Sequence, residues 1–391
     1  MTTSIQRVTI QGYRGARDLL LEPGRTCVLV GESSSGKSTV LTAIWTLLEA
    51  SAPMPTGDDV SHGHTRVHVE ATVGDRTLFL DARPPATLNL NREGAPDALF
   101  FPAHLRASTL LAPTDARARE IVGAVQTDDG GLSLVRSIAA LVQARVRALV
   151  VLIEEPELFL SPPAQRHLHR LLRALAARGR NQVFYSTHAP VFLGVDRLDE
   201  LVLVRYDARV GTTLLQPEAL PQRRAFRMVA ELDSERAEIF LSRAVLLVEG
   251  RTEKRVFPFV FAALGFDTDQ ESIAMIDCGG KGNIPLFVEI CNACEIPYVV
   301  VHDRDAPRGT APVDAERIAN ETILRTAGRR RTITLVPDFE GVTGLSARRG
   351  KPAAALKLFQ AGNDEVPLLL RQAVERVVAA ARRAPRTTPE A

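Results

Sequence analysis

Short apolar runs bounded by charged residues recur through the first half of the chain. Ala148–Ile153 is one such run, and runs of this kind predict strands that are buried on both faces of a sheet. Arg66–Val73 and Arg76–Leu80 instead alternate apolar and polar residues, which predicts an antiparallel pair turning at Gly74-Asp75. The remaining expected strands are Val8–Gln11, Thr26–Val30, Gln182–Tyr185, and a hairpin of Leu201–Tyr206 with Gly211–Leu215. Helices are expected at Lys37–Leu48, Leu132–Val146 and Pro163–Ala177.

A break in this pattern falls at Gln216–Gln222, which holds two prolines and no apolar period. Phe226–Leu241 is expected to form a connecting helix. Alternating strands and helices then resume, and this alternation indicates a parallel sheet flanked by helices. The elements expected there are Ala244–Val248, Glu253–Leu264, Ile273–Ile276, Ile284–Ala293, Tyr298–His302 and Thr332–Leu335. The predicted class is therefore α/β, with domains over residues 1–218 and 243–391, a linker over 219–242, and helices at the C-terminal end.

Composition narrows the class of protein. Hydrophobic residues make up 45% of the 391 residues and charged residues 24%, which is typical of a globular chain. The net charge is only +2, so a nucleic-acid site must be a local basic patch. The four cysteines include Cys291 and Cys294, which fall within an expected helix and are interpreted as buried thiols. Few cysteines, no apolar signal segment and no membrane span predict a cytoplasmic protein.

A phosphate-binding loop is the most specific motif. Gly31–Thr39 fits the pattern G-x-x-x-x-G-K-[ST] between an expected strand and an expected helix. Its glycines let backbone N–H groups face phosphate oxygens, and the helix N-terminus adds positive potential. Lys37 would meet the β- and γ-phosphates of ATP, and Ser38 would bind Mg²⁺. The nucleotide-binding residues predicted in this loop are Gly31, Ser34, Gly36, Lys37, Ser38 and Thr39.

Two later segments fit the same site. Val150–Pro156 is an apolar run ending in two carboxylates, and it resembles the Walker B strand of ABC-type ATPases. Glu154 stands where aspartate is usual, so its contact with the metal could run through water, and Glu155 would orient the attacking water. Ser186-Thr187-His188 follows another strand and resembles the switch segment of that superfamily. His188 would contact the γ-phosphate, although a lone histidine after a strand is more often structural.

Carboxylates at two strand ends predict a metal site in the second domain. Glu249-Gly250 follows one expected strand, and Glu253 opens the next helix. Asp303 and Asp305 end another strand, and alternate residues of an extended segment project to one side. In a parallel sheet these ends meet at one edge, and converging carboxylates repel unless a cation lies among them. Oxygen ligands favour Mg²⁺ or Mn²⁺.

Two further features are less specific. Asp338 and Glu340 follow another strand and could lie on one side of its end as a second metal group, with Lys351 neutralising a phosphate. A solvated turn explains Asp338 and Glu340 about as well. The glycine-rich turn Asp277–Asn283 could hold a phosphate or could simply join a strand to a helix.

Together these motifs resemble the OLD family (overcoming lysogenisation defect), in which an ABC-type P-loop ATPase domain precedes a Toprim domain. The resemblance rests on the P-loop, Glu154–Glu157, Ser186–His188, Glu249-Gly250 and Asp303 with Asp305. It implies an ATP-dependent DNA endonuclease or nickase, a homodimer or higher oligomer, and action against foreign DNA or in DNA repair. It also implies a possible helper protein encoded nearby. The metal ligands it implies are Glu249, Glu253, Asp303, Asp305, Asp338 and Glu340, and Lys351 matches the family less securely.

The chain departs from the OLD family in one respect, and two other functions remain as alternatives. Little chain separates Thr39 from Ala148, so a helical dimerisation insert found in many relatives has little room. An ATP-gated DNA-binding ATPase without nuclease activity is the main alternative function. Strand passage is less favoured, because each of the four tyrosines lies in or beside an expected strand. Basic clusters that could follow DNA are Arg223-Arg224 with Arg227, Arg329–Arg331, and Arg348-Arg349.

Overall fold

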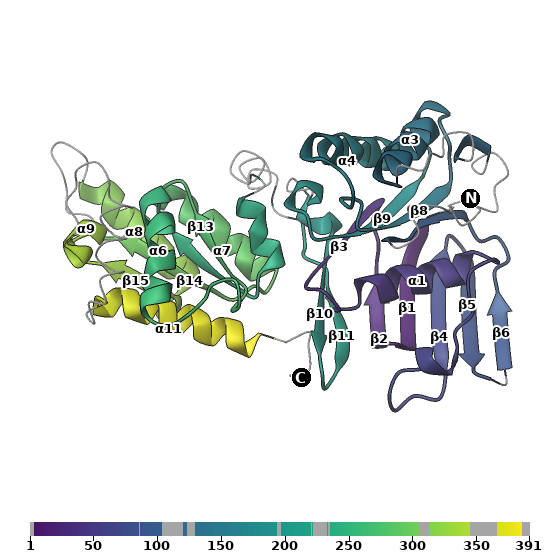
Figure 1. Ribbon diagram of the computed structural model, residues 1–391, viewed down its shortest axis with the longest axis horizontal. Coiled ribbons are helices and arrows are strands. Elements are labelled where there is room, and N and C mark those ends of the chain that lie inside the picture. The colour runs from purple at the N-terminus through teal and green to yellow at the C-terminus, as the bar shows by residue number, and fades with distance from the viewer. Residues whose placement is uncertain are drawn as a thin grey trace. The chain divides into compact units, whose positions relative to one another are not determined.

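The computed structural model divides the chain into two compact units. The N-terminal unit comprises Met1–Leu220 with Arg386–Ala391, and the C-terminal unit comprises Pro221–Pro385. The structure describes residues 4–85, 87–103, 120–122, 130–193, 197–219, 221, 233, 235–304, 313–344 and 366–384. Both units combine helices and sheets, which confirms the predicted α/β class (Figure 1).

The N-terminal unit is built on a mostly parallel sheet with the strand order β11-β10-β3-β9-β8-β7. β3, β8 and β9 are buried at every position, as short and mainly apolar strands in the middle of a parallel sheet are expected to be. β11 pairs antiparallel with β10 and forms the expected hairpin at one edge. The strands are β3 (Thr26–Val30), β7 (Asp97–Phe101), β8 (Leu149–Glu154), β9 (Gln182–Thr187), β10 (Leu201–Asp207) and β11 (Gly211–Leu215).

An antiparallel sheet with the order β2-β1-β4-β5-β6 lies in the same unit. The predicted pairing of β4 with β5 is confirmed, with Val73 opposite Arg76 across the turn. Strands β2, β6 and β7 were not among the expected elements. The antiparallel strands are β1 (Ile5–Tyr13), β2 (Ala16–Leu21), β4 (Val67–Val73), β5 (Arg76–Arg83) and β6 (Thr87–Asn91).

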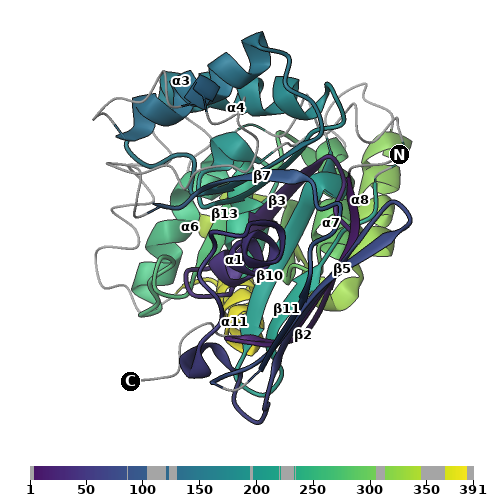
Figure 2. The same cartoon turned by 90° about the vertical axis from the view of Figure 1, so that its right-hand side faces the viewer.

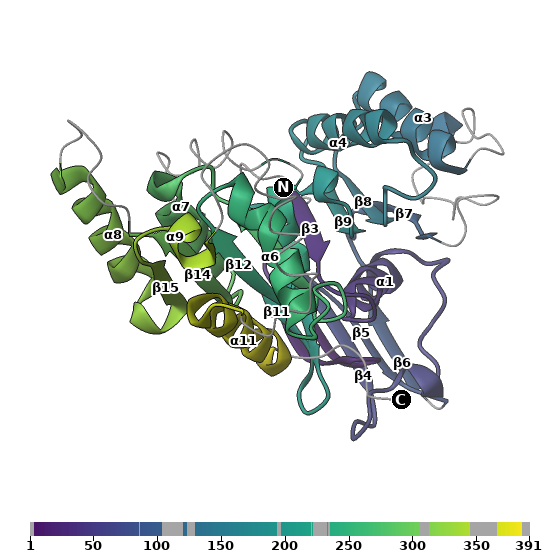
Figure 3. The same ribbon diagram turned by 60° about the vertical axis from the view of Figure 1, so that its left-hand side comes forward.

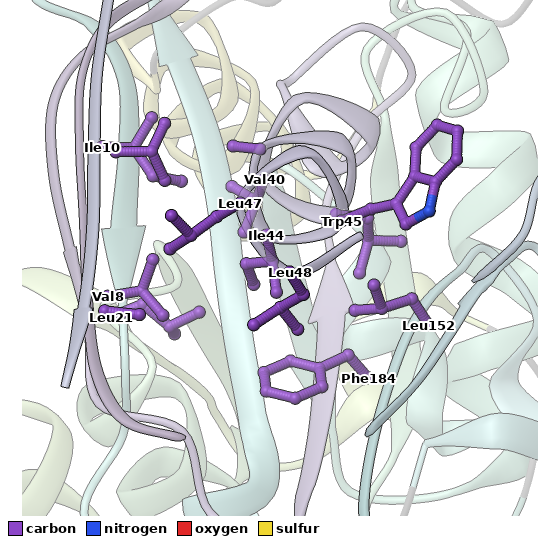
Figure 4. Packing of buried hydrophobic residues seen from close by; sticks show 14 of the residues in the cluster. Val8, Ile10, Leu21, Val40, Ile44, Trp45, Leu47, Leu48, Leu152 and Phe184 are labelled. Carbon is purple, nitrogen blue, oxygen red and sulfur yellow. The ribbon is translucent and has the colours of Figure 1, made fainter. Parts of the chain in front are cut away.

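Helix α1 (Lys37–Leu48) packs between these two sheets (Figure 2). Val40, Ile44 and Leu48 belong to a continuous apolar cluster that includes Val8 of β1 and Phe184 of β9. Figure 4 shows this packing, with side chains of both sheets pointing towards the helix. A helix that is apolar around most of its circumference must be covered on both sides. Because α1 begins at Lys37, this packing anchors the loop that precedes it.

Helices α3 (Gly130–Gln143) and α4 (Pro162–Ala176) contact one another and cover the other face of the parallel sheet (Figure 1). Leu168, Leu172 and Leu175 of α4 are buried, and they recur at helical spacing. The parallel sheet is thus covered by α1 on one face and by α3 and α4 on the other.

The C-terminal unit contains a parallel sheet with the order β13-β12-β14-β15. Helices α6 (Arg251–Ala263) and α11 (Leu368–Arg383) share an apolar cluster with one face of it, and α7 (Ile284–Ala293) and α8 (Val313–Ala327) pack on the other (Figure 3). This confirms the flanked parallel sheet. The strands are β12 (Ala244–Val248), β13 (Ile273–Asp277), β14 (Tyr298–Asp303) and β15 (Thr332–Leu335).

The connecting helix predicted over Phe226–Leu241 is wrong in its described part. Arg236–Leu241 forms a 3-10 helix that packs against β13. Ala237 and Phe240 are both buried, and the three-residue repeat of a 3-10 helix places them on one side. All four cysteines are buried and none forms a disulfide, as expected for Cys291 and Cys294. No helix within the described ranges has the length and apolar character needed to cross a membrane.

Candidate nucleotide and metal sites

The predicted P-loop follows β3 and packs against the hairpin of β10 and β11. The φ angle of Gly36 is 109°, and a Cβ there would lie 2.4 Å from the Thr212 Oγ1 atom. A Cβ at Gly31 would lie 2.1 Å from the backbone oxygen of Val204. The hydroxyl of Thr212 also donates to the backbone oxygen of Ser35 at 3.0 Å. Only glycine fits at both positions, so the hairpin fixes the path of the loop.

Lys37 is buried at the base of this loop. Its ammonium donates to the backbone oxygens of Gly31 at 2.9 Å and Glu32 at 2.7 Å. Burial lowers the pKa of Lys37 to about 8, against the opposing field of Glu155, Glu157 and Glu32. The hydroxyl of Ser38 belongs to an exposed residue at the start of α1, as a metal ligand at the mouth of the loop requires.

Glu154, Glu155 and His188 lie at the carboxyl edge of the same sheet. The carboxylate of Glu154 is buried and accepts a hydrogen bond from the Ala103 backbone N–H at 3.1 Å. Glu155 has a φ angle of 45°, and its N–H donates to the backbone oxygen of Ser186 at 2.9 Å. Its Oε1 atom lies 3.9 Å from the His188 Nε2 atom. The structure therefore brings Glu155 and His188 together, as predicted.

The protonation of His188 follows from its surroundings. Burial lowers the pKa of His188, the positive charge of Lys37 lowers it further, and Glu155 opposes both effects. The histidine is consequently neutral at neutral pH and can donate one hydrogen bond from its ring. The charge of Glu155 favours the protonated forms of both Lys37 and His188, which indicates that the three side chains lie near one another.

Glu157 belongs to the Glu154–Glu157 segment that carries the family resemblance, where the sequence assigns it no role, and the structure supplies one. One carboxylate oxygen accepts from the Thr187 hydroxyl at 2.9 Å, and the other accepts from the His188 backbone N–H at 2.7 Å. Burial is the main reason that the pKa of Glu157 is raised. Glu157 therefore holds the segment that presents His188. The sequence shows Glu157 as the third carboxylate of the Glu154–Glu157 segment. Its partners Thr187 and His188 could be found only once the order of the strands was known.

Glu249 and Asp303 lie at the carboxyl ends of β12 and β14, which are neighbouring parallel strands. The Asp303 backbone N–H donates to the Glu249 Oε2 atom at 3.4 Å, so these two predicted residues are brought together. Asp305 and Lys351 lie outside the described residues. Glu253 begins α6, and its Oε2 atom accepts from the Gly250 N–H at 3.1 Å, which is a helix-capping contact.

Backbone and side-chain contacts hold this edge in place. The Gly280 N–H donates to the Glu249 backbone oxygen at 2.8 Å, so the glycine-rich turn contacts the candidate site. Lys281 in that turn pairs with Glu316 at 2.7 Å. His302 is buried, with its Nδ1 atom 3.0 Å from the Asp303 backbone oxygen and its Nε2 atom 3.1 Å from the Thr334 hydroxyl. His302, which was not predicted, thus ties the end of β14 to β15.

The expectation that Asp338 and Glu340 share one side of a strand end is wrong. β15 ends at Leu335, and helix α9 (Phe339–Thr343) begins directly after Asp338. The Asp338 carboxylate accepts from the Gly341 N–H at 2.8 Å, because an aspartate at this position satisfies a free N–H of the first turn. Glu340 lies within that turn, so the two residues do not alternate along an extended segment.

The donor set at the Glu249–Asp303 edge fits a hard divalent cation, since both residues offer carboxylate oxygens. Within the part of the chain that the structure describes, no group of three or more His, Cys, Asp or Glu side chains is close enough to hold a metal ion. Asp305, the third predicted ligand, is outside that part.

Comparison with known families gives these sites a context. A model described as "Overcoming lysogenization defect protein-like, TOPRIM domain" matches residues 240–305, and an AAA domain model matches residues 79–194. The chain is 36% identical over 253 residues to the OLD nuclease of Thermus scotoductus. The chain is therefore similar to OLD nucleases over part of its length. The resemblance inferred from its motifs is thereby confirmed.

The OLD relatives are longer than this chain. The match to the Thermus scotoductus protein covers 58% of this chain and 47% of that protein. The Old nuclease of Escherichia phage P2 is 29% identical over 168 residues, which covers 40% of this chain and 28% of that protein. The chain therefore spans about half or less of the length of these OLD nucleases.

Two solved structures are similar to parts of this chain. The SMC head domain from Thermotoga maritima covers 55% of the chain and 99% of its own length, with 14% identity and a TM-score of 0.36. The C-terminal region of the Burkholderia pseudomallei OLD protein covers 36% of the chain and 99% of its own length, with 19% identity and a TM-score of 0.30.

Proposed function

We propose that this chain is an ATP-hydrolysing, divalent-metal-dependent DNA endonuclease or nickase. The observation that carries the proposal is the contact between Asp303 and Glu249 at the carboxyl edge of a Toprim sheet. Backbone N–H groups of Asp303 and Gly280 donate hydrogen bonds to Glu249 and so fix its position at this edge. The chain that carries this edge also carries a P-loop with Glu155 and His188 beside it.

In the ATPase half, each proposed role follows from a position. Lys37 would exchange its bonds to Gly31 and Glu32 for bonds to the β- and γ-phosphates. Ser38 would hold Mg²⁺, with Glu154 reaching it through water. Glu155 would orient the attacking water, and the neutral ring of His188 would donate to the γ-phosphate. Gly31, Ser34, Gly36 and Thr39 would complete the phosphate cradle.

In the nuclease half, Glu249, Glu253, Asp303 and Asp305 would hold Mg²⁺ or Mn²⁺. A bound divalent cation lowers the pKa of a coordinated water and neutralises charge on the scissile phosphate. Glu253 would use the carboxylate oxygen that does not cap α6. Asp338, Glu340 and Lys351 are proposed as a second group on the strength of the family resemblance, with Asp338 combining its cap with a ligand role.

The proposal also includes an oligomeric state and a biological role. A homodimer or higher oligomer would bring two P-loops to a shared ATP-dependent interface, and a helper protein encoded nearby could direct the cut. Defence against foreign DNA, or DNA repair, is the setting that the family resemblance implies, and the composition of the chain favours the cytoplasm as its location. The proposed cofactors are ATP and Mg²⁺ or Mn²⁺.

The alternative is an ATP-gated DNA-binding ATPase without nuclease activity. It is favoured by the finding that the described residues alone do not assemble three metal-binding side chains. Under this alternative, Glu249 and Asp303 would serve only to join β12 to β14.

Plasmid cleavage by the purified chain tests both functions. The reactions contain Mg²⁺ or Mn²⁺, with and without ATP, beside Asp303→Asn and Lys37→Ala. Metal-dependent nicking or linearisation that is lost in Asp303→Asn, with ATP hydrolysis retained, is the expected result. ATP-dependent DNA retention without cutting in any lane would favour the alternative, and cutting that persists in Asp303→Asn would overturn the proposed site.

A further inference from the structure

Five exposed arginines surround a hollow of about 760 Å³ in the N-terminal unit. They are Arg25, Arg145, Arg147, Arg178 and Arg180. A second hollow of about 660 Å³ shares Arg25 and Arg180 with the first. Among the described residues that line the two hollows there is no aspartate or glutamate. This arginine hollow therefore concentrates positive charge on a chain whose net charge is only +2.

The arginines are mounted on a hydrogen-bonded framework. Arg25, Arg147 and Arg180 come just before strands β3, β8 and β9, which begin at one edge of the sheet. Asn181 is completely buried and joins the two turns involved: its amide donates to the Val146 backbone oxygen at 2.9 Å and accepts from the Leu149 N–H at 3.1 Å. The hollow is thus a fixed feature of the sheet edge.

This edge is opposite to the nucleotide site. The P-loop follows β3, Glu155 follows β8 and His188 follows β9, whereas the arginines precede the same strands. Strands of this length span roughly 17–20 Å. The arginine hollow is therefore a separate site from the P-loop, and its side chains are not available to ATP bound there.

Helix termini explain only part of the cluster. Arg145 and Arg178 follow α3 and α4, where cations are stabilised by the helix dipole. Arg25, Arg147 and Arg180 precede strands and gain nothing of this kind. A hollow lined by five exposed guanidinium groups offers an anion several hydrogen-bond donors at once.

We infer that the arginine hollow binds the phosphate backbone of duplex DNA. Guanidinium groups form paired hydrogen bonds with phosphate oxygens. No aromatic side chain occurs among the described residues lining either hollow, so the stacking platform that single-stranded nucleic acid uses is absent from them. The identity of the anion as DNA rests on the proposed function, and the assignment adds a second DNA contact remote from the Toprim edge.

The test compares Arg147→Gln/Arg178→Gln with Arg76→Gln/Arg83→Gln in the full chain. The control pair removes two exposed arginines from β5 in the antiparallel sheet. Binding of a fluorescent duplex is measured by anisotropy against salt, with EDTA present so that the DNA is not cut. The slope of log K against log salt should become shallower by about 2 in the hollow variant and stay unchanged in the control. Over about 50 to 200 mM salt, this corresponds to roughly a tenfold smaller loss of affinity.

ATP hydrolysis and melting temperature should match the wild type in both variants. An unchanged salt slope in the hollow variant, while the wild type cuts DNA, would overturn the arginine hollow alone. Wild-type protein that never cuts DNA but shows the arginine-dependent slope would overturn the nuclease and retain the hollow. Arginine-dependent binding to vesicles of anionic phospholipid, with none to duplex DNA, would assign the hollow to a membrane surface and overturn the inference.

Discussion

The carboxylate of Glu157 accepts the His188 backbone N–H at 2.7 Å, and so connects the end of the Walker B segment to the switch histidine. The same carboxylate accepts from the Thr187 hydroxyl. Two neighbouring strand ends, β8 and β9, are joined at the point where Glu155 and His188 face each other. The position of His188 relative to Glu155 therefore depends on a residue that is proposed to touch neither phosphate nor water.

We predict that Glu157→Gln lowers the kcat of ATP hydrolysis about tenfold to hundredfold, because misplacing a reacting group by an ångström has effects of this size. An amide can accept one of the two hydrogen bonds but presents N–H groups to the other donor. The KM for ATP should rise less than kcat falls, because the charge of Glu157 supplies only part of the field that favours protonated Lys37. Steady-state phosphate release measures both constants.

The double variant Glu157→Gln/His188→Ala is the control for this prediction. If Glu157 acts through His188, the double variant should be no slower than His188→Ala alone. Losses that multiply would show that Glu157 acts independently of the histidine.

ATP affinity should depend on the protonation of Lys37. In the free protein its pKa is about 8, and a bound triphosphate favours the charged form and raises that pKa. Binding should therefore take up protons near pH 8, and affinity should weaken as the pH rises above 8, by up to about tenfold per unit. Calorimetry in buffers of different ionisation enthalpy measures the uptake. Lys37→Ala should bind weakly with no such trend, and the same trend in that variant would assign the titration to another group.

Glu253→Gln separates capping from metal binding. Glutamine at this position can still accept the Gly250 N–H, so the melting temperature should stay near that of the wild type. The loss of charge should raise the Mg²⁺ concentration needed for half-maximal cutting. Glu253→Ala should lose both, with about 1 kcal/mol of stability. Cutting by Glu253→Gln that follows the wild-type Mg²⁺ titration would leave Glu253 as a cap only.

Asp338 offers a similar pair of variants. Asparagine caps helices about as well as aspartate, so Asp338→Asn should unfold with the wild type, while Asp338→Ala should lose about 1 kcal/mol. Cutting by Asp338→Asn should fall at limiting Mn²⁺ if the second metal group operates. Denaturant unfolding and a metal titration of cutting provide the measurements. Normal cutting by Asp338→Asn at every metal concentration would remove Asp338 from the ligand set.

Sequence patterns located the elements that are buried on both sides. β3, α1, β12, α7 and β15 have the predicted bounds because uninterrupted apolar runs and the P-loop motif define them. β6 was not predicted from the sequence because three of its residues are exposed and it follows two prolines. Its pairing with β5 is decided by tertiary context rather than by its own pattern.

The residues of the candidate nucleotide and metal sites also divide into those that local sequence patterns predict and those that depend on tertiary contacts. Glu155 with His188, and Glu249 with Asp303, were predictable because parallel strands place their carboxyl ends at one edge. The cap formed by Asp338 was not predicted, because an acid three residues past a strand fits an extended ligand and a helix start equally well in sequence. Glu157 and His302 act across strands, and their partners are set by strand order, which the motifs do not contain.

The burial of α1 between two sheets has a consequence for how the nucleotide site can be lost. Amide hydrogens of a helix covered on both faces exchange with solvent only when its surroundings open. Lys37 and Ser38 form the first turn of that helix, and the body of the helix that anchors them unfolds only when the two sheets separate. The amides of α1 should exchange with deuterium as slowly as those of the central strands. The nucleotide site would then be lost only when the N-terminal unit itself unfolds.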